Sequence, residues 1–216
     1  QAVLKKYDVL MVADEVICGF GRTGNMWGSQ TFNIKPDLLT CAKALSSSYL
    51  PISAVLISDD LYTAVRDQSS ELGGFSHGYT YSGHPVPAAV ALETLKIYEE
   101  RDIVGHVQRV GPIMQARLRE FSDHPLVGEV RGVGLLAGVE VMADGANRLS
   151  FDPAAKIGPK VQALCEENGL LIRAMGDSIG FCPPLIIDEA TIEKMLAQFG
   201  KSLDQALDWA RQEGLV

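Results

Sequence analysis

The sequence has no long hydrophobic run. No apolar stretch approaches the roughly 20 residues that a helix needs to cross a bilayer, and no secretory signal pattern opens the chain. Lysine and arginine are scattered rather than gathered in a stripe, and the formal net charge is −8. Because nucleic acids and anionic membrane surfaces are bound by basic faces, we expect neither as a partner.

Disulfide and metal patterns are also absent. The cysteines are Cys18, Cys41, Cys165 and Cys182. They show no CxxC spacing, which favours reduced thiols and a cytoplasmic protein. His77 and His84 have no third partner at ligand spacing, so we expect no metal site.

What is present is an ordinary globular composition, with 47% hydrophobic and 21% charged residues. Apolar runs alternate with amphipathic stretches, which predicts an α/β fold. We place a domain boundary near residue 104 and expect domains at 1–103 and 104–216. The chain opens on Gln1, inside an amphipathic helix, which suggests a fragment of a longer protein.

Periodicity predicts the elements of each part. In the first part we expect strands at 9–13, 38–42 and 53–58, and helices at 61–67 (capped by Asp59 and Asp60) and 87–100. The short link after 43 favours an antiparallel strand in a mixed sheet. In the second part we expect helices at 104–123, 153–167 and 188–211, and strands at 127–130, 133–141 and 170–173, with a segment from 174 to 185 that leads into the last helix.

Two opposite charges close two of these strands. Asp14 ends the first strand and Lys43 ends the second, and open α/β sheets place ligands at the carboxyl ends of their strands. Buried charges need a partner, so a structural Asp14–Lys43 ion pair and a cofactor site are both open at this point.

The loop between them contains the pattern G-x-G-x-x-G at residues 19–24. A dinucleotide site would need a helix to open at the third glycine, but residues 25–30 carry no helical apolar repeat. Asp14 and Glu15 would also repel a pyrophosphate. We therefore expect a tight loop rather than a dinucleotide site.

Residues 75–85 are dense in hydroxyl and aromatic side chains and precede a long helix. Such a segment could bind a phosphate, or its Ser and Thr side chains could simply cap the helix.

Three ordered motifs resemble one family. They are ADEVICGFGRTG at 13–24, Lys43 followed by SSSYLPIS at 46–53, and HGYTYSGHP at 77–85. Together they resemble the class III pyridoxal-phosphate-dependent aminotransferases of fold type I, closest to the ω-amino-acid or diamine:pyruvate transaminases. The resemblance runs along the whole chain but covers only the C-terminal half of such enzymes. It implies part of the large-domain mixed sheet followed by a smaller C-terminal α/β domain.

The resemblance also implies roles for individual residues. Lys43 would form the internal aldimine with pyridoxal 5′-phosphate and then shuttle a proton. Asp14 would bind the pyridine nitrogen, and Val16, if the strand continues, would pack on the ring or belong to the core. Thr80 would reach the cofactor phosphate of a neighbouring subunit, which requires a homodimer with a shared active site.

In the second part, Arg173 matches the arginine that pairs with a substrate carboxylate. The alternative is a surface arginine paired with Asp177 or Glu140. Two departures from the family stand out. Ala44 replaces a glycine and would be strained if that position has positive φ. Ile17 replaces a glutamine of the ornithine and γ-aminobutyrate branch, which argues against those activities.

Three hypotheses follow. The first is an aminotransferase that moves an amino group from an amine or ω-amino acid to a 2-oxo acid such as pyruvate, with this fragment inactive alone. The second is another class III activity, an aminomutase or a decarboxylase. The third is a non-catalytic, truncated module.

Overall fold

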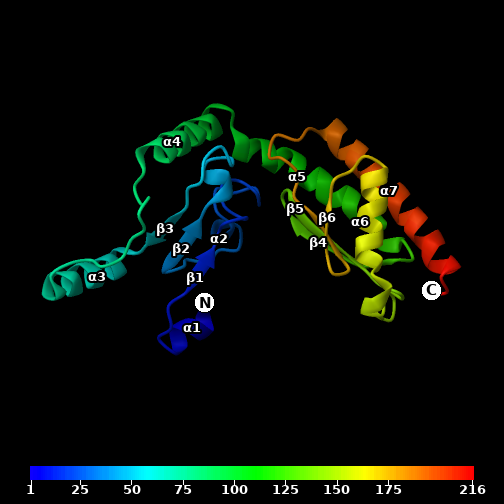
Figure 1. Cartoon of the computed structure of the whole chain (residues 1–216), viewed down its shortest axis with the longest axis horizontal. Coiled ribbons are helices and arrows are strands. Elements are labelled where there is room, and N and C mark those ends of the chain that lie inside the picture. Colours follow the sequence, from blue (N-terminus) through cyan, green and yellow to red (C-terminus); the bar gives the residue numbers. More distant parts are fainter. The chain divides into compact units, whose positions relative to one another are not determined.

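The computed structural model describes all residues from Gln1 to Val216. The chain divides into two compact units, Gln1–Val104 and Gly105–Val216. Figure 1 shows the elements of each unit along the chain. No helix is both long enough and apolar enough to span a bilayer.

The first unit holds a three-stranded mixed sheet in the order β1-β2-β3. Strands β1 and β2 run parallel, and β2 and β3 run antiparallel, which confirms the predicted mixed sheet. Its elements are α1 (Ala2–Lys6), β1 (Val12–Asp14), α2 (Gly28–Thr31), β2 (Leu38–Cys41), the 3-10 turn η1 (Lys43–Leu45), β3 (Ala54–Ile57), α3 (Asp59–Leu72) and α4 (Pro85–Glu100).

Helix α3 is longer than the sequence predicted and begins differently. The Ser58 side chain, not Asp59 or Asp60, accepts the Leu61 N–H as the N-cap. Both aspartates instead occupy the first turn, where a carboxylate favours the positive end of the helix dipole. The helix ends only at Gly73, whose φ of 82° suits a left-handed C-cap.

The second unit holds an antiparallel sheet in the order β4-β5-β7-β6. Its elements are α5 (Ile103–Arg119, which carries the boundary), η2 (Glu120–Asp123), β4 (Val127–Val133), β5 (Leu136–Val141), η3 (Pro153–Ala155), α6 (Ile157–Glu167), β6 (Arg173–Met175), β7 (Ser178–Phe181) and α7 (Glu189–Gln212). The long helices lie beside this sheet in Figure 1.

The strand predicted at 170–173 is wrong, and the segment from 174 to 185, to which the sequence assigned no strand, contains most of β6 and all of β7. Residues 170–172 form no strand, and Arg173 opens β6 instead of ending a strand. Gly176, with φ of 60°, turns the chain so that β6 and β7 form a hairpin. The prediction failed because Leu170 and Ile172 are apolar for another reason: they pack against the core from a loop and have no strand partner.

The second unit has a continuous buried core between its sheet and its helices. Phe199 of α7 is fully buried and meets the rings of Phe121 and Phe181 edge-on, at centroid distances of 5.2 and 4.9 Å. Edge-to-face ring pairs add stability beyond the area they bury. This unit therefore carries its own apolar support.

Candidate active site

The candidate site lies at one edge of the first sheet. Because β1 and β2 are parallel, their carboxyl ends meet at the same edge, and Asp14 pairs in register with Thr40. Lys43 follows Thr40 by three residues and opens η1. The structure thus brings Asp14 and Lys43 to one edge of the sheet, as the strand order requires.

Asp14 is exposed at this edge and forms no ion pair with Lys43. Its Oδ1 accepts a hydrogen bond from the Val16 N–H at 3.0 Å and lies 3.5 Å from the Thr40 hydroxyl. The strand ends at Asp14, so the two-residue alternation expected for Val16 does not continue. Val16 lies instead in the turn that follows and is half-buried.

Lys43 has an unusual backbone and a side chain open to solvent. Its φ is 44°, as is rare for a residue with a side chain. Ala44 has no positive φ, so the strain expected there falls on Lys43 itself. A residue with a side chain that is kept in the left-handed backbone conformation costs about 1–3 kcal/mol of stability, and such residues are often found at functional sites. Such a cost is sustained only where the surrounding loop is well anchored.

Helix α4 anchors that loop through Tyr98. The Tyr98 side chain is buried, and burial raises the pKa of its phenol, while a hydrogen bond with the Ser47 side chain and the charge of Arg22 oppose the shift. Ser46 is also buried and donates its hydroxyl proton to the Leu50 carbonyl at 2.7 Å. The loop after Lys43 is therefore held by hydroxyl side chains at both of these points.

Glu15 is a site neighbour whose role the sequence did not reveal. It is only 2% exposed, and its carboxylate accepts the backbone N–H groups of Gly28 and Ser29. The sequence signal was an acidic residue at a strand end with a glycine and a serine thirteen and fourteen residues on. The helix that begins there, α2, has only four residues. This agrees with the expectation that no sustained helix follows the glycine pattern, as a dinucleotide site would need.

The hydroxyl-rich segment before α4 does not cap the helix with Ser or Thr. The cap is His84, whose Nδ1 accepts the Val86 N–H at 3.2 Å. Ser82 instead accepts the Tyr79 N–H within the loop. Thr80 is exposed, and no hydrogen bond engages its hydroxyl. The capping alternative therefore fails for Thr80, which stays free for another partner.

This segment and the loop after Lys43 line one cavity of about 640 Å3. Its lining includes Pro51, Ile52 and Ser53 from the loop after Lys43, and residues 79 and 81–84 from the segment before α4. The structure thereby places two of the three sequence motifs side by side in the first unit.

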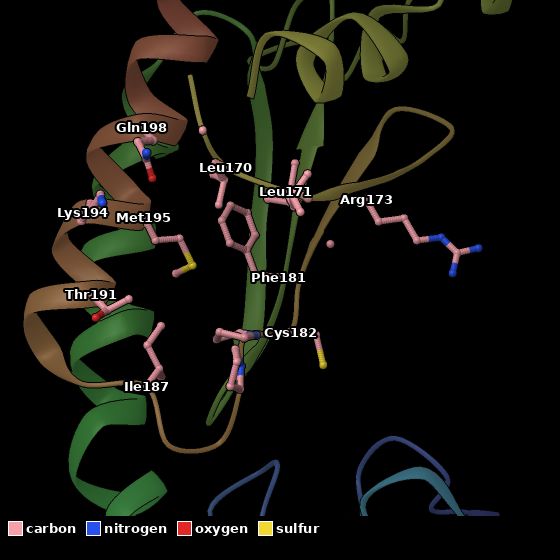
Figure 2. Close-up of a pocket in the computed structure, with 15 residues that line it drawn as sticks. Leu170, Leu171, Arg173, Phe181, Cys182, Ile187, Thr191, Lys194, Met195 and Gln198 are labelled. Atoms are coloured by element: carbon pink, nitrogen blue, oxygen red, sulfur yellow. The ribbon is translucent and has the colours of Figure 1, made fainter. Parts of the chain in front are cut away.

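Arg173 belongs to the second unit. It lines a groove of about 640 Å3 between the β6–β7 hairpin, the preceding loop and α7. Figure 2 shows its side chain extending away from α7 and from the Phe181 ring. The guanidinium is exposed and has no ion-pair partner in the chain.

The two alternative partners of Arg173 are engaged elsewhere. Glu140 pairs with Arg131 at 2.9 Å, and the Asp177 carboxylate accepts the Gly158 N–H at 3.2 Å. The expected alternative of a structural ion pair is therefore contradicted. Arg173 remains available for an anion from outside this chain.

Comparison with known proteins shows the family of this chain. The sequence profile of "Aminotransferase class-III" matches residues 1–203. A γ-aminobutyrate transaminase of Solanum lycopersicum named as chloroplastic is 52% identical over 94% of the chain and 39% of that protein. An uncharacterized aminotransferase, y4uB, of Sinorhizobium fredii is 46% identical over 99% of the chain and 46% of its own length.

Solved structures agree. A transaminase with L-ala superposes with a TM-score of 0.93 at 53% identity, over 96% of this chain and 49% of its own. The ω-transaminase from Pseudomonas jessenii in complex with PMP gives 0.93 at 48% identity, over 97% and 46%. The chain thus spans less than half the length of the curated relatives described here. We expected Ile17 to argue against γ-aminobutyrate transaminase activity. Because a relative with that name is 52% identical to this chain, that expectation loses its support. The chain belongs to the class III aminotransferases, a pyridoxal-phosphate-dependent family with the type I fold.

Proposed function

We propose that the protein containing this chain is an aminotransferase that moves an amino group from an amine or ω-amino acid to a 2-oxo acid such as pyruvate. One observation carries the proposal. Asp14 ends one of two neighbouring parallel strands, and Lys43 follows the other at the same sheet edge; both are exposed and unpaired with each other. A carboxylate and an amine held apart in this way suit the two ends of a pyridine aldehyde.

Each residue has a chemical task toward pyridoxal 5′-phosphate, which supplies an electron sink when bound. Lys43 would hold the aldehyde carbon through its amine and, when free, would serve as the base that moves a proton from the substrate carbon. Asp14 holds the proton on the ring nitrogen. Its charge keeps that nitrogen cationic while the substrate C–H bond breaks.

Two further residues complete the cofactor contacts in this proposal. Val16, next to Asp14, packs on a ring face. Thr80 donates its hydroxyl to the cofactor phosphate of a neighbouring subunit, so the enzyme is a homodimer with shared active sites. The free hydroxyl of Thr80 and its place in an exposed loop support this role.

Arg173 binds a substrate carboxylate. A guanidinium pairs bidentately with such a group, and that of Arg173 is exposed at the edge of a groove with no ion pair of its own. Carboxylate-bearing substrates, both ω-amino acids and 2-oxo acids, are the ones that this residue serves.

Residues 1–103 are part of the cofactor-binding large domain, and residues 104–216 form the small domain. The exposure of Asp14, Lys43, Thr80 and Arg173 supports an incomplete site, so we expect these 216 residues alone to be inactive. We place the protein in the cytoplasm on the cysteine pattern. Some relatives are named as mitochondrial or chloroplastic, so cell fractionation decides this point.

The test of the cofactor role is covalent labelling of the full-length protein. Borohydride reduction after loading with pyridoxal phosphate should leave the cofactor on the peptide that contains Lys43. Lys43→Ala should lose the label and all turnover, whereas Lys35→Ala, at an exposed lysine of the same unit, should keep both. Cofactor bound elsewhere, or not at all, would refute the proposal and favour a non-catalytic module.

The reaction type needs a separate assay. Amine turnover that depends on pyruvate, with alanine formed in equal amount, is expected for an aminotransferase. Turnover of an amino acid without a 2-oxo acid acceptor would indicate an aminomutase or a decarboxylase instead.

The shared site is tested with two inactive variants. If Thr80 serves the neighbouring subunit, Lys43→Ala and Thr80→Val should complement each other when subunits are mixed, because the hybrid dimer contains one intact site. If Thr80 serves its own subunit, mixing restores nothing.

The role of Arg173 predicts a selective loss. Arg173→Ala should weaken binding of carboxylate substrates about 10- to 100-fold, the worth of a charge-assisted pair, and leave a simple amine donor unaffected. An equal loss for both substrate classes would argue against a carboxylate contact.

A further inference from the structure

Glu15 is a buried carboxylate directly beside the exposed Asp14. Only 2% of Glu15 is exposed. Asp14 ends β1 and is exposed, whereas Glu15, the next residue, is buried, so the two neighbouring carboxylates lie in different surroundings. Burying a carboxylate is costly unless it is fully hydrogen-bonded, and a retained one needs an explanation.

The explanation lies thirteen residues along the chain. Glu15 Oε2 accepts the Gly28 N–H at 2.8 Å, and Oε1 accepts the Ser29 N–H at 2.6 Å. Hydrogen bonds to a charged acceptor are short and strong, and these donors open α2, where backbone N–H groups lack helical partners. One side chain thereby closes the loop that starts at the end of β1.

Tight packing fixes the closed loop. A Cβ atom on Gly28 would lie 2.8 Å from Cys18 Cβ and 3.0 Å from Glu15 Oε2, so no side chain fits there. The Phe20 and Trp27 rings meet inside the loop at a centroid distance of 5.0 Å. The Gly19 N–H also donates to the Glu15 carbonyl at 2.9 Å. Rotation of the backbone at Glu15 is therefore opposed from several sides.

We propose that Glu15 is a positioning residue that aims the Asp14 carboxylate at the cofactor ring nitrogen. This rests on the proposed function of Asp14. The Glu15 N–H donates to the Thr40 carbonyl at 2.9 Å, and the Val16 N–H donates to Asp14. The peptide groups on both sides of Glu15 are thus fixed, and its side chain locks them to α2. Glu15 itself faces the loop and does not act on the cofactor.

The test compares two cofactors in the full-length protein. One is pyridoxal 5′-phosphate, and the other is its 1-deaza analogue, in which carbon replaces the ring nitrogen. Glu15→Gln keeps the length of the side chain but turns one acceptor oxygen into a donor that opposes an N–H group. We expect its dissociation constant for pyridoxal phosphate to rise about tenfold, as for partners that orient a binding group, with binding of the analogue unchanged. Equilibrium dialysis measures both.

Two variants frame the result. Asp14→Asn should show the same selective loss, and Glu167→Gln, an exposed glutamate of the second unit, should show none. If Glu15→Gln does not fold, Glu15→Asp keeps the charge but shortens its reach to the Gly28 and Ser29 N–H groups, and it should give the same selectivity.

The outcomes separate the two proposals. A wild-type protein that binds neither cofactor refutes the function of Asp14 and Lys43 and this inference with it. A wild-type protein that binds both, with Glu15→Gln weakening both equally or neither, refutes only the positioning role. An equal loss would mean that Glu15 merely supports the fold.

Discussion

The two units use their apolar residues in opposite ways. In the second unit, every member of the buried core cluster lies between Val107 and Ala210. In the first unit, few large side chains are buried, and most of the exposed large apolar side chains of the chain are found there. All four residues of β3 are exposed, and α3 buries none of its side chains.

The unit with its own buried core is therefore not the unit that carries Asp14 and Lys43. Burial of the core of the second unit can offset the conformational entropy that this unit loses on folding. The first unit leaves the apolar surface of its sheet uncovered. Patches of this kind mark surfaces that contact further protein. The residues that we propose bind the cofactor thus lie on the unit that leaves the most apolar surface exposed.

The largest expected effect is on folding of the separated units. Residues 102–216, which keep α5 whole, should melt in one cooperative transition because they contain the complete core cluster. Residues 1–101 should show no cooperative transition. Thermal melting followed by circular dichroism measures both, and a sharp transition in residues 1–101 would contradict the comparison.

A core substitution should show the same contrast within the intact chain. Phe199→Ala removes a fully buried ring and should lower the free energy of unfolding by about 3–5 kcal/mol. Val55→Ala, at an exposed position of β3, should change it by less than about 0.5 kcal/mol. Urea denaturation measures both, and similar losses would mean that β3 is covered in the chain alone.

A smaller loss of unfolding free energy is expected at Gly158, where two backbone segments of the second unit lie in close contact. A Cβ atom on Gly158 would overlap the Gly176 carbonyl, so Gly158→Ala should cost about 1–3 kcal/mol of unfolding free energy. Gly138→Ala is the matched control, because the nearest atoms there are 3.9 Å away, on the flexible Arg131 side chain. A loss at Gly138 as large as at Gly158 would point to strand effects rather than to close packing.

The smallest effect is a pH dependence confined to the second unit. Burial lowers the pKa of His124, Arg211 lowers it further, and Asp204 opposes both. Its Nδ1 accepts the Leu126 N–H at 3.2 Å, which requires an unprotonated nitrogen. The unfolded chain therefore takes up the proton first, so this contribution is complete above about pH 6.5 and declines as the pH falls below it.

Chemical denaturation at about pH 7.5 and about pH 5.5 measures this decline. His124→Asn keeps an acceptor for the Leu126 N–H but does not titrate, so its stability should change less between the two values. Equal pH dependence in both proteins would assign the effect to the carboxylates.

Most of the first sheet was predictable because its strands are short apolar runs closed by charges. The antiparallel β3 followed from the short link after Lys43, and the sheet edge shared by Asp14 and Lys43 followed from two parallel strand ends. The hairpin of β6 and β7 was not predictable in this way. Its strands are short, and the apolar residues before Arg173 pack without a strand partner.

The sequence by itself determined the family, and its ordered motifs also named the residues that we propose carry the chemistry, because such motifs can be read without the fold. Only the tertiary structure decided that Lys43 rather than Ala44 has the left-handed backbone, that Arg173 has no partner, and that Glu15 is buried on Gly28 and Ser29. Backbone angles, ion pairs and hydrogen bonds between distant residues depend on how the chain packs. No local pattern of residues encodes them.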